Sequence, residues 1–439
     1  MQSRTVLLLF GLLAGCAAAS LAQDKIVLEG YVTRSASGSD FDVNAIRILC
    51  GGAKHGPILL IHGIMAPAVG CPGDAPLVGE GLYIYGVWNR NTNSIDATRI
   101  ESRQLEFFEV DGSAVIDAAP AQEAAGTQVP GLLVRADGYW IRITGETKIE
   151  WISPFKSLAD VKAGDWIKYK GKQDAAGVVV AASVRIGSNV IGSGEEKLRS
   201  GKEYDPSAVP AGTKQNVLED TFVGGCRGLF VGGCDPKRFP PFNDAEMQAR
   251  IENIGNSLVP AYQRALPDSD PAKIDFRFQL IDTNLFREAL TLPNGIVLVP
   301  HQVVERLQND SQLAAVLVDA MDRALERQEF RAEGKQKVAI AATLAGALVP
   351  HAGPGIAGNG ASGEVQILMK EMEQRDRVSL ALLHDAGYDI VQAPMAWWLL
   401  APGKQKSLTE INLPKRAAYL YSILGETWHN PAASASQAH

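Results

Sequence analysis

The feature that most constrains the fold is a change in hydrophobic periodicity along the 439-residue chain. Between residues 25 and 188, apolar and polar residues alternate over short runs that Gly, Asn, Asp and Ser interrupt, which is typical of small antiparallel sheets. From about residue 243 the apolar residues recur at helical spacing. A stretch rich in Gly, Ser, Pro and charge, at 189–242, separates the two regions and is expected to be a linker. We therefore expect a multidomain chain of β-domains followed by a mainly helical α+β domain.

The alternating region contains an internal repeat. The segment "GEGLYIYG" at 79–86 aligns without a gap on "GDWIKYKG" at 164–171. Upstream, "GYVTRSASGSDFDVNAIRI" at 30–48 aligns on "GLLVRADGYWIRITGETKI" at 131–149. Two copies of one unit predict two small antiparallel barrels in tandem.

The repeat sets the expected domain boundaries. We place the first barrel at 25–103 and the second at 104–188, and the helical domain at 243–430. The last residues, 431–439, are expected to form a disordered tail. The repeated unit resembles a bacterial extracytoplasmic β-domain family of unknown function.

The first 25 residues, "MQSRTVLLLFGLLAGCAAASLAQDK", have the pattern of a secretory signal peptide at 1–22. Their apolar run is too short to cross a bilayer. Two processing routes are compatible with it. "SLA" at 20–22 suits ordinary signal-peptidase cleavage, whereas "LAGC" at 13–16 resembles a lipobox that would leave a lipid on Cys16. We expect an exported protein, periplasmic or extracellular, that contacts a membrane only if this lipid anchor is present.

The cysteines predict disulfides. Besides Cys16 the chain has four cysteines, an even number that favours disulfide pairing in an exported protein. The simplest of the three connectivities pairs Cys50 with Cys71 and Cys226 with Cys234. No C-x-x-C motif or well-spaced histidine accompanies them, so the pattern favours disulfides over structural zinc.

The net charge of -7 argues against one class of partner. The sequence has no Lys/Arg run that would form a basic surface for phosphate backbones. We expect no nucleic-acid partner.

The segment that bears most on function is "SQLAAVLVDAMDRALERQ" at 311–328, which is predicted to be a helix. Asn309 is a suitable N-cap, and the apolar residues form one stripe. Asp319 and Arg323 lie four residues apart on an edge of that stripe. An H-E-x-x-H helix presents two histidines to one zinc ion in this geometry, with a glutamate next to the first as general base. Here Ala320 stands in the place of that glutamate.

Three segments together make the region 243–430 resemble the zinc metallopeptidase family of HtpX and the prenyl-protein proteases. The helix at 311–328 is similar to the family's H-E-x-x-H helix, and "EMEQRDRVSLALLHDAGYD" at 371–389 to its next conserved helix. "REALTLPNGIVLV" at 287–299 is similar to the edge strand beside which substrate peptides lie. The resemblance implies that the helices at 310–328 and about 364–385 pack together. The residues equivalent to the substrate strand are Glu288, Ala289, Leu290, Thr291, Leu292 and Pro293.

The chemistry departs from that family. The resemblance places the two histidine ligands at Asp319 and Arg323, the general base at Ala320, and the carboxylate ligand at Met372, counted back from the family aspartate at Asp376. None of the four positions 319, 320, 323 and 372 has the side chain that the family uses there. The seven histidines include no pair four residues apart. An arginine also puts a permanent positive charge where a dication would sit. We therefore expect no catalytic residue, no metal ligand and no cofactor.

Two interpretations of Asp319 and Arg323 follow. They form either an ordinary surface ion pair worth ~0.2–0.5 kcal/mol, or an internal pair in which Arg323 fills the vacated zinc pocket beside Met372. The loss of the zinc ligands and of the general base favours a pseudoenzyme, an exported binding or scaffold protein of the cell envelope with an unknown protein or peptide ligand. The alternatives are an active zinc metalloendopeptidase with a non-standard site, for which zinc would be the cofactor, and an envelope binding module that works through its barrels.

Overall fold

The computed structural model describes thirteen stretches of the chain: 25–50, 59–61, 64–66, 74–103, 109–122, 131–174, 177–192, 195–196, 241–283, 287–291, 295–327, 361–401 and 414–428. The expected signal peptide with Cys16, most of the expected linker at 189–242, and the expected tail at 431–439 lie outside them. Cys71, Cys226 and Cys234 also lie outside. Cys50 is buried and disulfide-bonded.

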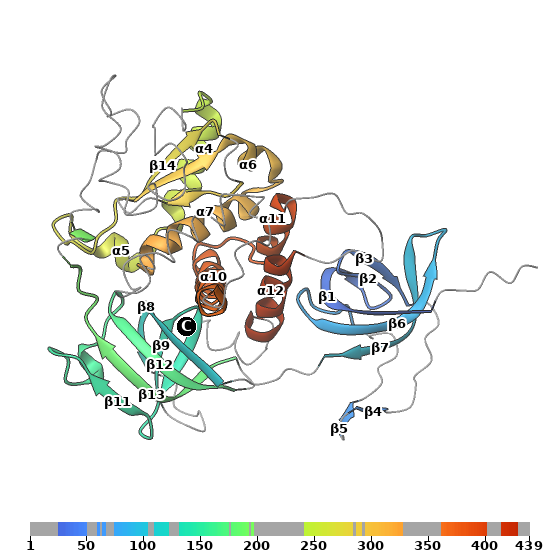
Figure 1. The fold of residues 1–439 in the computed structure, drawn as a ribbon, viewed down its shortest axis with the longest axis horizontal. Coiled ribbons are helices and arrows are strands. Elements are labelled where there is room, and N and C mark those ends of the chain that lie inside the picture. Colours follow the sequence, from blue (N-terminus) through green and yellow to red (C-terminus); the bar gives the residue numbers. More distant parts are fainter. Residues whose placement is uncertain are drawn as a thin grey trace, which may run out of the picture.

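The first strands form a closed barrel, coloured blue in Figure 1, with the order β1-β2-β3-β7-β6. Its walls are antiparallel except between β3 and β7, which are parallel. A separate hairpin of β4 (Leu59–Ile61) and β5 (Ile64–Ala66) lies between β3 and β6 in the chain. The barrel strands are β1 (Lys25–Ser37), β2 (Asp40–Val43), β3 (Ile46–Leu49), β6 (Gly81–Asn89) and β7 (Ser94–Ser102).

The second sheet has the strand order β10-β9-β8-β12-β13-β11, and β10 also pairs with β13. Five of its strands therefore form a closed ring of pairings in the order β8-β9-β10-β13-β12. This ring corresponds to β1-β2-β3-β7-β6 of the first barrel, and β10 and β13 are its parallel pair. This is the order of a five-stranded Greek-key barrel of OB-fold type. Its strands are β8 (Glu109–Gln122), β9 (Leu132–Ala136), β10 (Tyr139–Ile143), β11 (Lys148–Trp151), β12 (Trp166–Gln173) and β13 (Val179–Gly187).

The two sheets confirm one half of the repeat alignment and correct the other. Segments 79–86 and 164–171 lead into β6 and β12, which occupy equivalent places. Segments 30–48 and 131–149 are not equivalent, because the first covers β1 to β3 and the second covers β9 to β11. The counterpart of β1 is β8. All these strands alternate apolar and polar residues with a period of two. An alignment of the two repeats that is displaced by one whole strand therefore matches the hydrophobic pattern almost as well as the correct one. The expectation of purely antiparallel barrels was also wrong, since each ring includes a parallel pair.

A glycine at the same place in both repeats allows two strands to approach closely. Gly86 in β6 and Gly171 in β12 each lie at a register shift against the next strand. A Cβ atom on Gly171 would lie 2.4 Å from the carbonyl oxygen of Val180. The glycine is therefore required by backbone contact across the strand pair.

Substituting Gly171→Ala is expected to lower the free energy of unfolding by about 1–3 kcal/mol, because the β12–β13 backbones must separate. Denaturant unfolding followed by circular dichroism measures the change. Gly145→Ala is the matched control, since a Cβ there meets nothing within 4 Å. Equal stability of the two variants would contradict the close approach.

The C-terminal region combines helices with a small sheet of order β14-β16-β15. β14 (Arg277–Ile281) and β16 (Ile296–Pro300) are parallel, and the short β15 (Leu290–Thr291) lies antiparallel at the edge. The helices are α4 (Ala245–Leu258), α5 (Ala261–Ala265), α6 (His301–Arg306), α7 (Asp310–Leu325), α10 (Ala361–Asp385), α11 (Gln392–Leu400) and α12 (Lys415–Ile423), followed by a π-helical turn, η4 (Leu424–Trp428). The expected β region with a barrel, followed by a helical region, is confirmed.

Helix α7 lies at the centre of this region. Its predicted cap is confirmed, because the Asn309 side chain accepts a hydrogen bond of 2.9 Å from the Gln312 amide. The expected packing of α7 against α10 is also observed. Burial extends beyond the single apolar stripe that was expected, since every residue from Gln312 to Asp322 is buried. α7 is therefore a core helix, and its polar residues lie in the interior.

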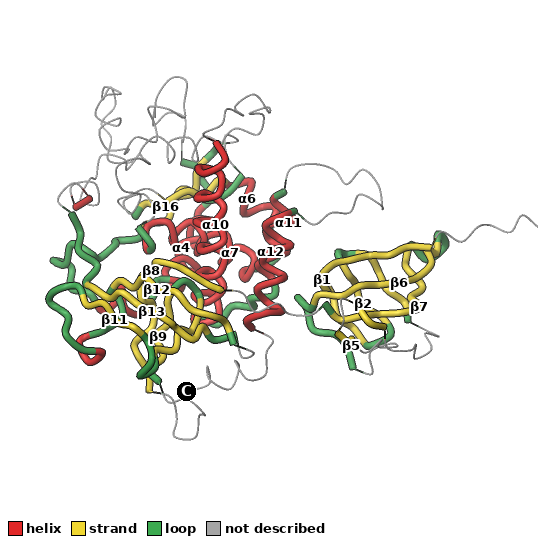
Figure 2. The backbone as a smooth tube through the Cα atoms, turned by 60° about the horizontal axis from the view of Figure 1, so that its bottom comes forward, coloured by secondary structure: helices red, strands yellow, loops and turns green. Residues whose placement is uncertain are grey.

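The two sheets lie on different sides of the helices. In Figures 1 and 2 the second sheet lies below α10, and the first barrel lies beyond α12. Gly425 in η4 packs so closely on Gly79 that a Cβ on Gly425 would lie 2.3 Å from the Gly79 carbonyl oxygen. None of the described helices combines the length and apolar character that crossing a membrane requires.

Candidate functional site

The position at which the family resemblance would place zinc holds an ion cluster built from three helices. Asp319 comes from α7, Asp376 from α10 and Arg416 from α12, and both carboxylates are 1% exposed. The Nε of Arg416 donates to Oδ1 of Asp376 at 2.7 Å, and its Nη2 donates to Oδ1 of Asp319. One guanidinium thus bridges the two carboxylates. We call these three residues the Arg416 cluster.

Neighbouring side chains hold the guanidinium in place. The ring of Trp397 in α11 lies 3.4 Å from its central carbon, a cation–π contact. Oε2 of Glu288 lies 3.8 Å from Nη1 of Arg416, so the chain entering β15 runs beside the cluster. Nε of Arg375 lies 3.9 Å from Oδ1 of Asp319 and adds a second positive charge.

The two carboxylates respond differently to this environment. Burial by itself would raise the pKa of Asp319, but the charges of Arg416, Arg375 and Arg323 together hold that pKa below its ordinary value. Burial raises the pKa of Asp376 to about 6, against the opposing charge of Arg416. Asp319 is therefore the permanent anion of the cluster. Asp376 can take up a proton in mild acid.

The residues predicted from the sequence meet here in part. Asp319 is paired with Arg416 and not, as proposed from the spacing, across one helical turn with Arg323. Arg323 acts on Asp319 as a nearby charge that lowers its pKa. The surface-pair interpretation fails because Asp319 is fully buried. Met372 is half-buried, one helical turn before Asp376.

Arg416 is the functional residue that sequence reasoning missed. It lies in α12, in "KRAAYLYSI", downstream of the three segments that carry the family resemblance. Ninety-seven residues separate it from Asp319. No spacing rule links positions so far apart.

The Arg416 cluster lacks the groups with which a zinc peptidase binds its metal and activates water. The fully buried Ala320 has no group that could take a proton from water. Within the described residues, no group of three or more His, Cys, Asp or Glu side chains is placed to hold a metal ion. The Arg416 guanidinium already supplies positive charge between the two carboxylates, so these residues do not fit a zinc ion.

A second buried acid lies one turn further along α7. Asp322 is 0% exposed, and neither of its carboxylate oxygens has a hydrogen-bond partner among the described residues. Burial, followed by the charges of Glu326 and Asp319, raises its pKa well above the ordinary value. Asp322 is therefore a destabilising group in the core of α7.

Of the six residues that the resemblance assigns to the substrate strand, 288–293, the structure describes the first four. Leu290 and Thr291 form β15 as expected, with Ala289 buried and Glu288 half-exposed at its start. Leu292 and Pro293 lie outside the described residues. β15 pairs with β16 on one side and forms the edge of the three described strands.

No protein-family model matches this chain, and no curated protein matches it. Any function proposed for it therefore depends on the geometry of its own residues.

Proposed function

We propose that the chain is an exported, non-catalytic homologue of zinc metallopeptidases that acts as a binding or scaffold protein of the cell envelope. The observation that supports this most is the Arg416 cluster. An internal cation replaces the metal there, so the charge of the buried carboxylates is balanced without zinc. The domain assignment, two barrel repeats followed by a metallopeptidase-like domain, is part of the same proposal.

A peptide-binding role is supported by the edge strand. β15 presents one side without a described strand partner, and an extended peptide can add to such an edge through main-chain hydrogen bonds. The half-exposed Glu288 carboxylate stands at the start of this edge, 3.8 Å from Arg416. The unknown protein or peptide ligand of the proposal would lie along β15.

A scaffold role is supported by the attachment of the second sheet. Arg135 in β9 donates from Nε to Asp117 Oδ1 at 2.7 Å and from Nη1 to Asp385 Oδ1, at the end of α10, at 2.9 Å. The Val115 amide donates to Glu326 at 3.0 Å. These bonds connect the sheet to the C-terminal ends of α7 and α10.

The proposal predicts that the purified mature protein contains less than stoichiometric zinc and cleaves no peptide in a chelator-sensitive way. Elemental analysis after incubation with zinc and dialysis measures the first, and a broad peptide-library assay measures the second. The physical reason is that Ala320 cannot activate water and Arg416 repels a dication.

The alternatives predict other outcomes. One zinc per chain, together with cleavage that Asp319→Ala abolishes, would establish an active metalloendopeptidase with a non-standard site. Ligand capture that survives substitutions along β15 but not in the sheets would favour an envelope binding module that works through its barrels.

A further inference from the structure

An apolar and aromatic patch lies on the outer face of the first barrel. Val27 in β1 is 65% exposed, and among the four exposed large hydrophobic side chains of the described residues it is the one that lies within a strand. The strand register pairs Val27 with Tyr85 of β6, and Tyr83 and Val87 lie two residues to either side of Tyr85 on the same face. We call Val27, Tyr83, Tyr85 and Val87 the Val27 patch. A contiguous apolar patch with a polar rim is typical of an interaction surface.

The second sheet shows that a barrel of this type does not need these side chains. The ungapped repeat places Lys170 of β12 where Tyr85 stands in β6. Lys170 pairs with Asp111 of β8, as Tyr85 pairs with Val27 of β1. The same outer face therefore carries charges in one repeat, and apolar and aromatic side chains in the other. It follows that the Val27 patch is not a requirement of the barrel fold.

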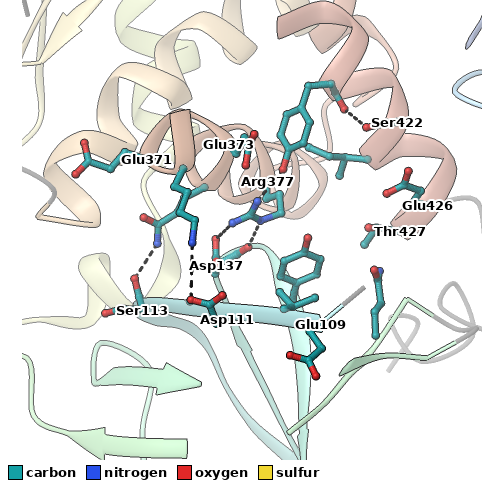
Figure 3. Close-up of a pocket in the computed structure, with 18 of the residues that line it drawn as sticks. Glu109, Asp111, Ser113, Asp137, Glu371, Glu373, Arg377, Ser422, Glu426 and Thr427 are labelled. Carbon is teal, nitrogen blue, oxygen red and sulfur yellow. Dashed lines mark hydrogen bonds and ion pairs between the residues drawn. The ribbon is translucent and has the colours of Figure 1, made fainter. Parts of the chain in front are cut away.

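In the second sheet, the corresponding face lies against a helix. Figure 3 shows Asp111 and Ser113 on the part of β8 that lies beside α10, and Oδ2 of Asp111 is 3.9 Å from Nζ of Lys370 in that helix. In the first barrel, α12 contacts β1, and Tyr31 packs against the core of the helical region. Val27 lies four residues before Tyr31 and stays exposed. The Val27 patch is therefore the part of this face that its own chain leaves open to a partner.

The tyrosine at the centre of the patch is held in position. The hydroxyl of Tyr85 donates to Oε2 of Glu101 at 3.2 Å, and the guanidinium carbon of Arg99 lies 3.7 Å from the centre of the Tyr85 ring. Nε of Arg99 lies 3.2 Å from Oε1 of Glu101, which is 3% exposed. A side chain that is already ordered loses little conformational entropy when a partner binds. Tyrosine and arginine are also the residue types enriched at the centres of protein interfaces.

The charges beside Val27 are arranged so that the patch is complementary to itself. Lys25 precedes Val27 by two residues and Glu29 follows it by two, and all three side chains are exposed on the same side of β1. A two-fold axis that crosses β1 at Val27, parallel to the sheet and perpendicular to the strand, exchanges these two positions. Lys25 of one copy would thus lie opposite Glu29 of the other copy, and this pair would form twice.

We propose that the Val27 patch is the interface of a homodimer, in which two first barrels pack face to face about this axis. Val27 contacts its own counterpart, and Tyr83 of one copy packs against Val87 of the other. The two Lys25–Glu29 pairs fix the orientation of the barrels and disfavour other partners. The Arg416 cluster and β15 take no part in this contact, so the inference does not depend on the proposed function.

Sedimentation equilibrium of the purified mature chain, over a wide range of protein concentration, tests the proposal. We expect a monomer–dimer equilibrium in which the dimer fraction rises with concentration. Val27→Asp should raise the dimer dissociation constant by at least about tenfold, because it places two carboxylates at the centre of the interface. The second sheet has Asp111 at the equivalent place, so the barrel fold accepts this side chain. Lys168→Glu, a charge reversal on the exposed face of the second sheet, is the control and should leave the dimer unchanged.

Charge reversals test the two-fold arrangement. Lys25→Glu and Glu29→Lys should each raise the dissociation constant by about tenfold, because each places like charges opposite one another at two points of the interface. The double variant that carries both changes should dimerise almost as tightly as the original chain. Opposite charges again face each other across the axis in that variant.

Three results would overturn the proposal. The first is a monomer at every concentration. The second is a dimer that Val27→Asp leaves intact, which would place the contact elsewhere on the molecule. The third is a double charge reversal that dimerises no better than the single variants, which would exclude the two-fold pairing of Lys25 with Glu29. Thermal melts followed by circular dichroism confirm that each variant is folded.

Discussion

Arg416→Ala is expected to destabilise the helical region by about 3–5 kcal/mol, the cost of removing one partner from a buried charge network. Asp319 and Asp376 are each 1% exposed, and Arg416 is the residue that hydrogen-bonds to both. Without it, two carboxylates would face each other in the core of α7 and α10. Guanidinium chloride unfolding, followed by tryptophan fluorescence, measures the loss.

Two further variants separate this effect from simple loss of packing. Arg323→Ala removes a cation whose charge lowers the pKa of Asp319, whereas Arg416 hydrogen-bonds to both carboxylates, so we expect a smaller loss than for Arg416→Ala. A triple variant, Arg416→Met with Asp319→Asn and Asp376→Asn, removes all charge from the cluster. It should recover much of the stability, because uncharged groups do not need a counter-ion. Equal effects of Arg323→Ala and Arg416→Ala would contradict the central place of Arg416.

Asp322→Asn is expected to stabilise the protein by about 1–3 kcal/mol at pH 8, because the amide keeps the size of the side chain but removes the negative charge that is costly to bury. The raised pKa of Asp322 sets the sign of the pH dependence. A carboxyl whose folded pKa exceeds its unfolded value costs nothing below the unfolded value, and costs increasing stability as the pH rises toward the folded value. The variant removes this titration, so its advantage should appear as the pH rises above about 4.

Denaturant unfolding at several pH values between 4 and 8 measures this difference. The matched control is Asp310→Asn, the same change in the first turn of the same helix. Asp310 is exposed, and its bond with Arg250 and its place at the helix N-terminus are stabilising. The control should therefore lose up to about 1 kcal/mol. A loss of stability in Asp322→Asn at pH 8 would refute the interpretation of Asp322 as a destabilising group.

Local patterns in the sequence determined several features of this protein. The change from alternating to helical periodicity placed the border between the β region and the helical region. The repeated eight-residue segment correctly matched β6 with β12, because the glycine that closes each segment serves the same close strand approach. The cap at Asn309 and the absence of an H-E-x-x-H motif at 319–323 could likewise be read directly. Each of these depends on residues a few positions apart in the chain.

Other features were decided only by the tertiary structure. The sequence pattern of a strand does not identify its partner, so the upstream repeat was aligned one strand out of place, and the parallel pairs that complete each ring were missed. The spacing of Asp319 and Arg323 suggested a pair across one helical turn. The folded chain instead brings Arg416 to Asp319 from a helix 97 residues away. A buried carboxylate bonds whichever cation the packing of helices places beside it, and that packing depends on contacts between distant segments that no local pattern records.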